Sequence, residues 1–167
     1  MLTQRGRYAL KALIYLAQTE GSERPRQIGA IAAEEQIPRK FLEAILVDLK
    51  RARLVESVRG QAGGYRLARP AEEIMFGDII RATDGPLALV PCVSKLFYRR
   101  CDDCVDEATC AIRHVMAGVR DTVSGILDQT SLADAIRVGA GERAPHAGDG
   151  ADGADAADAK DAAETLA

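Results

Sequence analysis

The first 70 residues change from helical to strand periodicity at Leu54, and this change constrains the fold more than any other feature. Apolar residues recur every three or four positions in the segments 3–18, 26–36 and 38–51. After Leu54, the runs LVESV and YRLA have strand character, and the glycine-rich run RGQAGG joins them. Three helices followed by a hairpin describe a winged helix-turn-helix. We therefore predict a mainly α protein with a small β-hairpin.

The segment 38–51 is the helix predicted to face DNA. Pro38 suits the first turn of a helix, and Gln36 and Ile37 form the bend that separates it from the preceding short helix. The apolar stripe expected to point inward consists of Phe41, Leu42, Ile45, Leu46 and Leu49. The other faces carry Arg39, Lys40, Glu43, Val47, Lys50 and Arg51. This outer face is polar, mostly basic and long enough to lie in a major groove.

The glycine-rich turn of the hairpin is the second predicted DNA contact. Its glycines supply positive φ or allow a close approach, and Arg59 stands at the shoulder of the turn. The turn has neither the GxGxxG nor the GxxxxGK[ST] pattern and joins two strands, which argues against a phosphate-binding loop. We expect Arg59 to enter a minor groove, and we include Gln61 in the same turn among the DNA-binding residues.

Charge is distributed unevenly along the chain. Residues 1–70 carry 13 Lys and Arg against 7 Asp and Glu. Residues 71–138 carry 7 against 11, and residues 139–167 carry 2 against 7. A basic first segment followed by acidic ones is typical of a nucleic-acid-facing front end, although a solvated mixed surface would show the same excess. Together with the predicted helix-turn-helix and wing, this pattern favours double-stranded DNA as the partner.

All four cysteines lie in one short segment with the spacing C-x8-C-x2-C-x5-C. Thiolates select zinc, copper(I) or iron–sulfur clusters, and four of them can close a zinc site or hold a cluster. A thiol–disulfide pair with two bystanders is an alternative. Ordinary buried thiols are another, but the charged residues around Cys101 and Cys104 favour a loop at the solvent edge.

The chain shows no signal peptide and no apolar run of membrane-spanning length, so we expect a cytoplasmic protein with reduced thiols and no membrane partner. The segment 72–83 is predicted to be a short helix closed by Asp84-Gly85-Pro86. Thr3 and Ser131 are suited to cap the first and last helices.

A long helix is predicted at about 111–129, with an apolar stripe of about five turns. Its members are Ile112, Val115, Met116, Val119, Val123, Ile126 and Leu127. Such a helix more often belongs to a core than to an interface. Because the preceding domain is already small and self-contained, the stripe needs another partner, and the same helix of a second subunit is the economical one, which predicts a homodimer.

The acidic segment 139–167, rich in Ala, Gly and Asp, offers nothing large to bury and is expected to be disordered. The predicted organisation is a DNA-binding domain at 1–70, a linker helix, cysteine loop and dimerisation helix at 71–138, and this tail.

Residues 1–137 contain, in order, the segments LTQRGRYALKALIYLA, QIPRKFLEAILVDLKRARLVES, VRGQAGGYRLARP, IMFGDIIRATDGPLALVPC and TCAIRHVMAGVRDTVSGILDQTSLADAI. Together they resemble the bacterial Rrf2 family of dimeric winged-helix transcription regulators, the family of IscR, NsrR and CymR. The resemblance implies that the recognition helix enters the major groove with Lys40, Glu43 and Ala44 near bases. It also implies that the wing brings Arg59 to the minor groove.

The resemblance further implies an iron–sulfur cluster held by three cysteines. In this chain they are Cys92, Cys104 and Cys110. Relatives take a fourth ligand from a histidine three residues after the last cysteine, or from an acid near the partner's N-terminus; this chain has Arg113 and Tyr8 there. Cys101, an extra thiol in a longer loop, is our first choice as fourth ligand, and His114 is the second. Four cysteines favour a 4Fe–4S cluster, whereas histidine ligation favours 2Fe–2S.

The leading hypothesis is a transcription repressor or dual regulator whose DNA affinity changes when this cluster is gained, damaged or lost in response to iron, redox state or nitric oxide. Structural zinc in the same residues is one alternative. Control by a regulatory protein partner, with cysteines that switch by oxidation, is the other. An enzyme is disfavoured, because only His114 lies near a thiol and no acid–base constellation accompanies it.

Overall fold

The structure is a computed structural model that describes residues 2–21, 24–60 and 62–141. Its first helix, α1 (Gln4–Gln18), begins at Thr3, whose side chain accepts a hydrogen bond from the amide of Gly6. Thr3 also donates hydrogen bonds of 2.6 and 2.8 Å to Asp84, the residue that ends helix α4 (Phe76–Thr83). The predicted cap is confirmed, and it ties the start of α1 to the end of α4.

Helices α2 (Ile28–Glu34) and α3 (Arg39–Arg51) meet across a tight turn, which confirms the predicted helix-turn-helix. Gln36 adopts a positive φ of 53° in this turn, and Pro38 directly precedes the first turn of α3. The side chains that α3 buries are Leu42, Ile45, Leu46 and Leu49.

Phe41 departs from the predicted inward stripe of α3. Its side chain is 39% exposed, and its ring packs edge-on against Tyr8 of α1, with the ring centroids 5.7 Å apart. The prediction that Phe41 faces inward is therefore wrong, because its aromatic partner lies at the rim of the α1–α3 contact and not inside the core.

Strands β1 (Val55–Val58) and β2 (Gly64–Leu67) pair antiparallel, in a register that places Val58 opposite Gly64. The backbone of Arg26 bridges to β2 with two hydrogen bonds of 2.8 Å, so the segment before α2 extends the hairpin on its other edge. A Cβ atom at Gly64 would collide with the carbonyl oxygen of Arg26, so this close approach requires glycine. The hairpin is the predicted wing.

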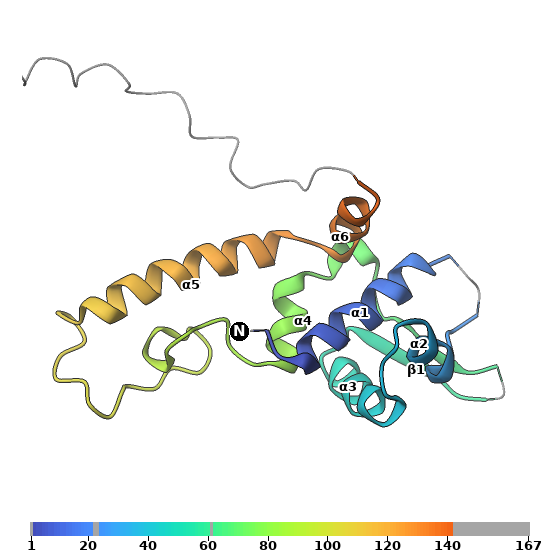
Figure 1. The fold of residues 1–167 in the computed structure, drawn as a ribbon, viewed down its shortest axis with the longest axis horizontal. Helices are drawn as coiled ribbons and strands as arrows, with labels where there is room; N and C mark the ends of the chain where they lie inside the picture. Colours follow the sequence, from blue (N-terminus) through green and yellow to red (C-terminus); the bar gives the residue numbers. More distant parts are fainter. Residues whose placement is uncertain (1, 22–23, 61, 142–167) are drawn as a thin grey trace, which may run out of the picture.

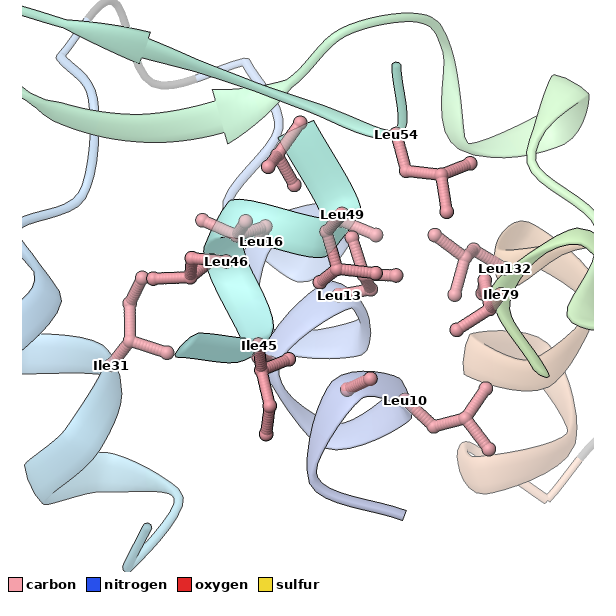
Figure 2. Packing of buried hydrophobic residues seen from close by; sticks show 14 of the residues in the cluster. Leu10, Leu13, Leu16, Ile31, Ile45, Leu46, Leu49, Leu54, Ile79 and Leu132 are labelled. Carbon is pink, nitrogen blue, oxygen red and sulfur yellow. The ribbon is translucent and has the colours of Figure 1, made fainter. Parts of the chain in front are cut away.

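One apolar cluster joins α1, α2, α3, the start of the hairpin, α4 and the last helix, α6 (Leu132–Gly139) (Figure 2). The side chains labelled there are Leu10, Leu13, Leu16, Ile31, Ile45, Leu46, Leu49, Leu54, Ile79 and Leu132. Burial of each such side chain contributes about 1.5–3 kcal/mol relative to exposure. Ile79 and Leu132 come from beyond residue 70, so this core includes residues from both sides of the predicted domain boundary. The boundary itself stays a prediction.

The segment after Pro70 differs from the single helix predicted at 72–83. A short 3-10 turn, η1 (Ala71–Glu73), precedes α4, and the chain is extended between them. Met75 forms an isolated antiparallel bridge with Ser131, flanked by two backbone hydrogen bonds of 2.9 Å. This bridge interrupts the helix, because its backbone groups are paired with a distant segment.

Helix α6 begins with a capping box in which the side chains of Ser131 and Asp134 each accept a hydrogen bond from the other residue's backbone amide. The hydroxyl of Ser131 also donates a 2.7 Å hydrogen bond to the Asp134 carboxylate, and this bond, with the one from the Ser131 amide, lowers the pKa of Asp134. The cap predicted at Ser131 is confirmed. The acidic tail predicted at 139–167 lies outside the described residues from position 142 onward.

The long helix α5 (Ala111–Gln129) has the predicted bounds. Together with the loop before it, α5 extends away from the helical core (Figure 1). Among the helices that the structure describes, none combines the length and apolar character needed to cross a membrane.

Candidate functional site

Cys92 lies in a short 3-10 turn, η2 (Pro91–Val93), that packs against α5. Its side chain is 5% exposed, and its neighbours Val93 and Ser94 are buried with it. The expectation that the thiols occupy a solvent-edge loop is therefore wrong for Cys92. The other three cysteines are partly exposed.

The four cysteines line a common pocket of about 340 Å³. Cys101 and Cys104 belong to a tight turn in which the Cys104 amide donates a 3.2 Å hydrogen bond to the Cys101 carbonyl. Cys110 is the residue that directly precedes α5. Three stretches of chain thus bring thiols to one place, and the charged residues that share the pocket are Asp103, Asp106 and Arg113.

The extra cysteine of the loop lies against the buried one. The neighbouring Cys92 thiol raises the pKa of Cys101, and Asp103 and Cys104 act in the same direction. His114, the second choice as fourth ligand, is not among the residues that line this pocket. Its Nε2 atom lies 2.8 Å from the carbonyl oxygen of Ala108. The geometry therefore places Cys101, and not His114, with the other three thiols.

Four thiols around one pocket are a suitable donor set for a soft metal or an iron–sulfur cluster. Within the described residues, no three His, Cys, Asp or Glu side chains are placed closely enough to hold a single metal ion. The fit of a cluster to this pocket thus rests on donor chemistry and on the shared cavity, and the ligands would have to be drawn together on binding.

Two arginines of α5 hold the turn that carries Cys92. Arg113 donates a hydrogen bond to the carbonyl oxygen of Cys92, and Arg120, two turns further along the helix, donates one to the carbonyl oxygen of Val93. The side chain of Arg120 is only 17% exposed. Consecutive carbonyls of the turn are therefore fixed to one face of α5.

Salt bridges extend this attachment. Asp121 of α5 lies 3.2 Å from the ammonium group of Lys95 and also accepts hydrogen bonds from Arg120. The Arg120 and Lys95 side chains lower the pKa of this carboxyl group. On the loop side, the hydroxyl of Tyr98 donates to Glu107 at 2.7 Å, which raises the pKa of Tyr98.

A second connection runs from α5 to the helical core. Arg81 of α4 donates two hydrogen bonds of 2.7 Å to the carboxylate of Asp128 near the end of α5. A Cβ atom at Gly77 would collide with this carboxylate, so a glycine in α4 gives the ion pair its space. Because α4 packs against both α1 and α3, the cysteine turn is linked to the predicted recognition helix through α5 and α4.

The predicted DNA-binding side chains of α3 lie on its solvent side. The exposed residues of that set are Arg39, Lys40, Glu43, Ala44, Lys50 and Arg51. Glu43 forms an ion pair of 3.4 Å with Arg39 one turn earlier. Lys50 donates a 2.6 Å hydrogen bond to the hydroxyl of Ser57 in β1, which ties the end of α3 to the wing.

The wing presents Arg59 in the turn after β1, where the residue is exposed. Gln61, predicted to contact DNA from the same turn, lies outside the described residues. A pocket of about 370 Å³ separates the wing from the starts of α2 and α3, and the side chains of Gln27 and Arg39 line it. The wing and α3 thus flank one concave surface.

Helix α5 carries a second exposed feature. Its apolar residues Ile112, Val115, Val119, Val123 and Ile126 are all exposed. At about 100° per residue they fall within an arc of about 80° on the helix, away from the face that carries Arg113 and Arg120. Within the described residues, α5 has no buried side chain, so no other helix or strand covers this stripe.

Sequence reasoning missed the contacts of Arg113 and Arg120 with the cysteine turn. The available signal was their spacing of seven residues on one helical face, beside the apolar stripe but not part of it. That spacing places two cations in line, although it gives no information about which backbone they reach.

Comparisons of the sequence with known proteins find a matching family. The Rrf2 family, described as iron-dependent transcriptional regulators, matches residues 2–138. An rrf2-like HTH-type transcriptional regulator of Rhodobacter capsulatus is 41% identical over 141 residues, which cover 83% of this chain and 94% of that protein.

Solved structures confirm the predicted fold class. The structure of CymR, the global cysteine regulator of Bacillus subtilis, matches with a TM-score of 0.67 and 32% identity over 83% of this chain and 97% of that one. The structure of IscR from T. potens matches with a TM-score of 0.62 and 31% identity over 83% of this chain and 88% of that one.

Proposed function

This chain belongs to the Rrf2 family of transcriptional regulators, and from that premise we propose that it binds operator DNA as a homodimer and switches its DNA affinity through an iron–sulfur cluster. The observation that carries the proposal is the pocket in which four cysteines from three stretches of chain meet beside α5. The description of the family as iron-dependent supports the same assignment.

The DNA-binding part of the proposal rests on α3 and the wing. The residues proposed to contact DNA are Arg39, Lys40, Glu43, Ala44, Lys50, Arg51, Arg59 and Gln61, the last of which lies outside the described residues. An α-helix fits the major groove, and an arginine at the tip of a wing suits a narrow minor groove. The similar proteins are named as transcriptional regulators, which is a non-enzymatic role.

The sensing part rests on the cysteine pocket. We propose Cys92, Cys101, Cys104 and Cys110 as the ligands, with His114 as the alternative to Cys101, and an all-cysteine set favours a 4Fe–4S over a 2Fe–2S cluster. Such a cluster would supply a centre whose charge and integrity depend on iron supply, oxygen or nitric oxide. Zinc is the metal that the same four thiols would otherwise take.

The attachment of the cysteine turn to α5 supports coupling between the two parts. Ligation draws the four thiols together, and Arg113 and Arg120 transmit a shift of the Cys92 turn to α5. The stripe on α5 is our proposed dimer contact, so a shift of α5 changes the spacing of the two recognition helices. A tenfold to hundredfold change in affinity needs only about 1.4–3 kcal/mol.

A second candidate is a regulator controlled by thiol oxidation or by a protein partner. The position of Cys92 and Cys101 in one pocket favours it, as does the structural similarity to the cysteine regulator CymR. In that case, the protein reconstituted with iron and sulfide would stay colourless, and its DNA affinity would respond to peroxide.

Two substitutions test the DNA-reading assignment. Arg59→Ala is expected to weaken binding mainly where the minor groove is narrow, because its guanidinium is attracted by the enhanced negative potential there. Glu43→Ala is expected to loosen base preference, because a carboxylate accepts hydrogen bonds from cytosine amino groups. Binding to a panel of duplexes that vary at single positions measures both effects. An equal loss of affinity on every duplex would contradict the roles of both residues.

A further inference from the structure

The outward face of α3 has an apolar centre. Successive helical residues are about 100° apart, so Val47 stands opposite the arc that α3 buries. Its side chain is 46% exposed, and Ala44, one turn earlier on the same face, is exposed as well. The middle of the surface proposed to enter the major groove therefore presents methyl groups.

Two polar side chains beside this centre already have partners within the protein. Glu43 is paired with Arg39 at the start of the helix, and Lys50 is bonded to Ser57 of the wing. Hydrogen-bonding groups thus flank Val47 on both sides along the helix. Recognition at the middle of α3 has to rely on apolar contact.

A valine at this position also conflicts with local preferences. β-Branched residues are weaker helix formers than most straight-chain residues, and an exposed valine buries nothing in the protein itself. Scattered surface valines are ordinary. This one occupies the centre of a face whose charged members are mostly basic, and a local choice that serves neither helix nor core is expected at functional sites.

We propose that Val47, with Ala44 beside it, recognises the C5-methyl group of thymine, so that each half-site of the operator carries a thymine under the middle of α3. Thymine is the base that presents a methyl group in the major groove, and apolar side chains contact it there. The flanking cations Lys40 and Arg51 suit the phosphates on either side of the groove. This inference rests on the proposed function, because it requires α3 to lie in the major groove.

The test uses duplexes that differ by single methyl groups. A high-affinity duplex is selected from a random library with the wild-type protein, and each thymine in turn is replaced by deoxyuridine, which leaves every hydrogen-bonding edge unchanged. At the contacted position, the affinity of the wild-type protein should fall about fourfold per half-site, the equivalent of about 0.8 kcal/mol for one buried methyl group. Val47→Ala should bind the thymine and uracil duplexes with nearly equal affinity.

Val138→Ala is the matched control, because it removes the same methyl groups from a valine that is 42% exposed on α6, away from the proposed DNA contacts, and it should keep the thymine-to-uracil ratio of the wild-type protein. If the wild-type protein binds the selected duplex specifically but tolerates uracil at every position, the inference about Val47 is wrong and the proposed function stands. If Val47→Ala discriminates thymine from uracil as strongly as the wild-type protein does, the inference is likewise wrong. If no duplex is enriched at all, the proposed DNA-binding function itself fails.

Discussion

Alanine at Cys92, Cys101, Cys104 or Cys110 is expected to leave the protein colourless after anaerobic reconstitution with iron and sulfide, whereas the wild-type protein turns brown. The four thiols line one pocket, and each is proposed to ligate iron, so the loss of one removes a ligand that the others cannot replace. Iron and sulfide content per subunit, measured with the visible spectrum, should fall from a full cluster to near zero in each of the four variants.

His114→Ala is the matched control for Cys101→Ala, because the two residues compete for the role of fourth ligand. The imidazole lies outside the pocket, so His114→Ala should keep the spectrum of the wild-type protein. A normal cluster in Cys101→Ala together with its loss in His114→Ala would refute the choice of Cys101 while leaving the function intact. Because Cys92 is buried, circular dichroism should first establish that Cys92→Ala is folded.

Glutamate at Val119 or Val123 is expected to convert the dimer to monomer and to abolish specific DNA binding. Both residues lie in the exposed apolar stripe of α5, where a carboxylate would be buried without a partner in the proposed interface. An uncompensated buried charge costs about 3–5 kcal/mol, which raises the dissociation constant of the dimer roughly a hundredfold or more. Analytical ultracentrifugation across a concentration series measures the shift.

Gly125→Glu adds the same charge at an exposed position of α5 that lies about 120° around the helix from the centre of the stripe and has open space for a side chain, and it should leave the dimer intact. If both valine variants sediment as dimers at the concentrations where the wild-type protein does, this stripe is not the interface. The cluster should still form in the monomeric variants, because all four proposed ligands come from one chain.

Features that depend on local sequence were predictable. Helix α5 has the predicted bounds because its apolar spacing is regular and Thr130 and Ser131 leave the helical conformation. The caps at Thr3 and Ser131 follow from hydroxyl groups placed directly before helical runs. The wing follows from its glycine-rich turn between two strand-like runs, so the winged-helix architecture could be derived from periodicity and turn chemistry alone.

Features that depend on distant segments were not predictable. The helix predicted at 72–83 is broken because Met75 pairs with Ser131, more than 50 residues away. Phe41 is exposed because Tyr8 offers an aromatic contact at the rim of the core. Cys92 is buried because α5 returns over its turn and holds it through arginines, and the charge of the neighbouring sequence gave no indication of that contact.

The candidate site was likewise predictable in part. The cysteine spacing predicted that these residues act together, and the structure does bring all four to one pocket. The sequence left the choice between Cys101 and His114 open, because it does not determine which of the two side chains the folded loop brings to the other three thiols. In the structure, Cys101 lines the pocket with the other three cysteines and His114 does not, and the fourth ligand stays a prediction.

The measurement that tests the central claim most directly is the affinity of one operator duplex for cluster-loaded and cluster-free protein prepared from the same anaerobic batch. Fluorescence anisotropy gives both dissociation constants. The salt concentration is kept fixed, because DNA affinity falls as salt concentration rises. We predict that the two constants differ by at least about tenfold and that Cys104→Ala shows the cluster-free value under both treatments. Equal constants for two forms that both bind the operator specifically would contradict the account.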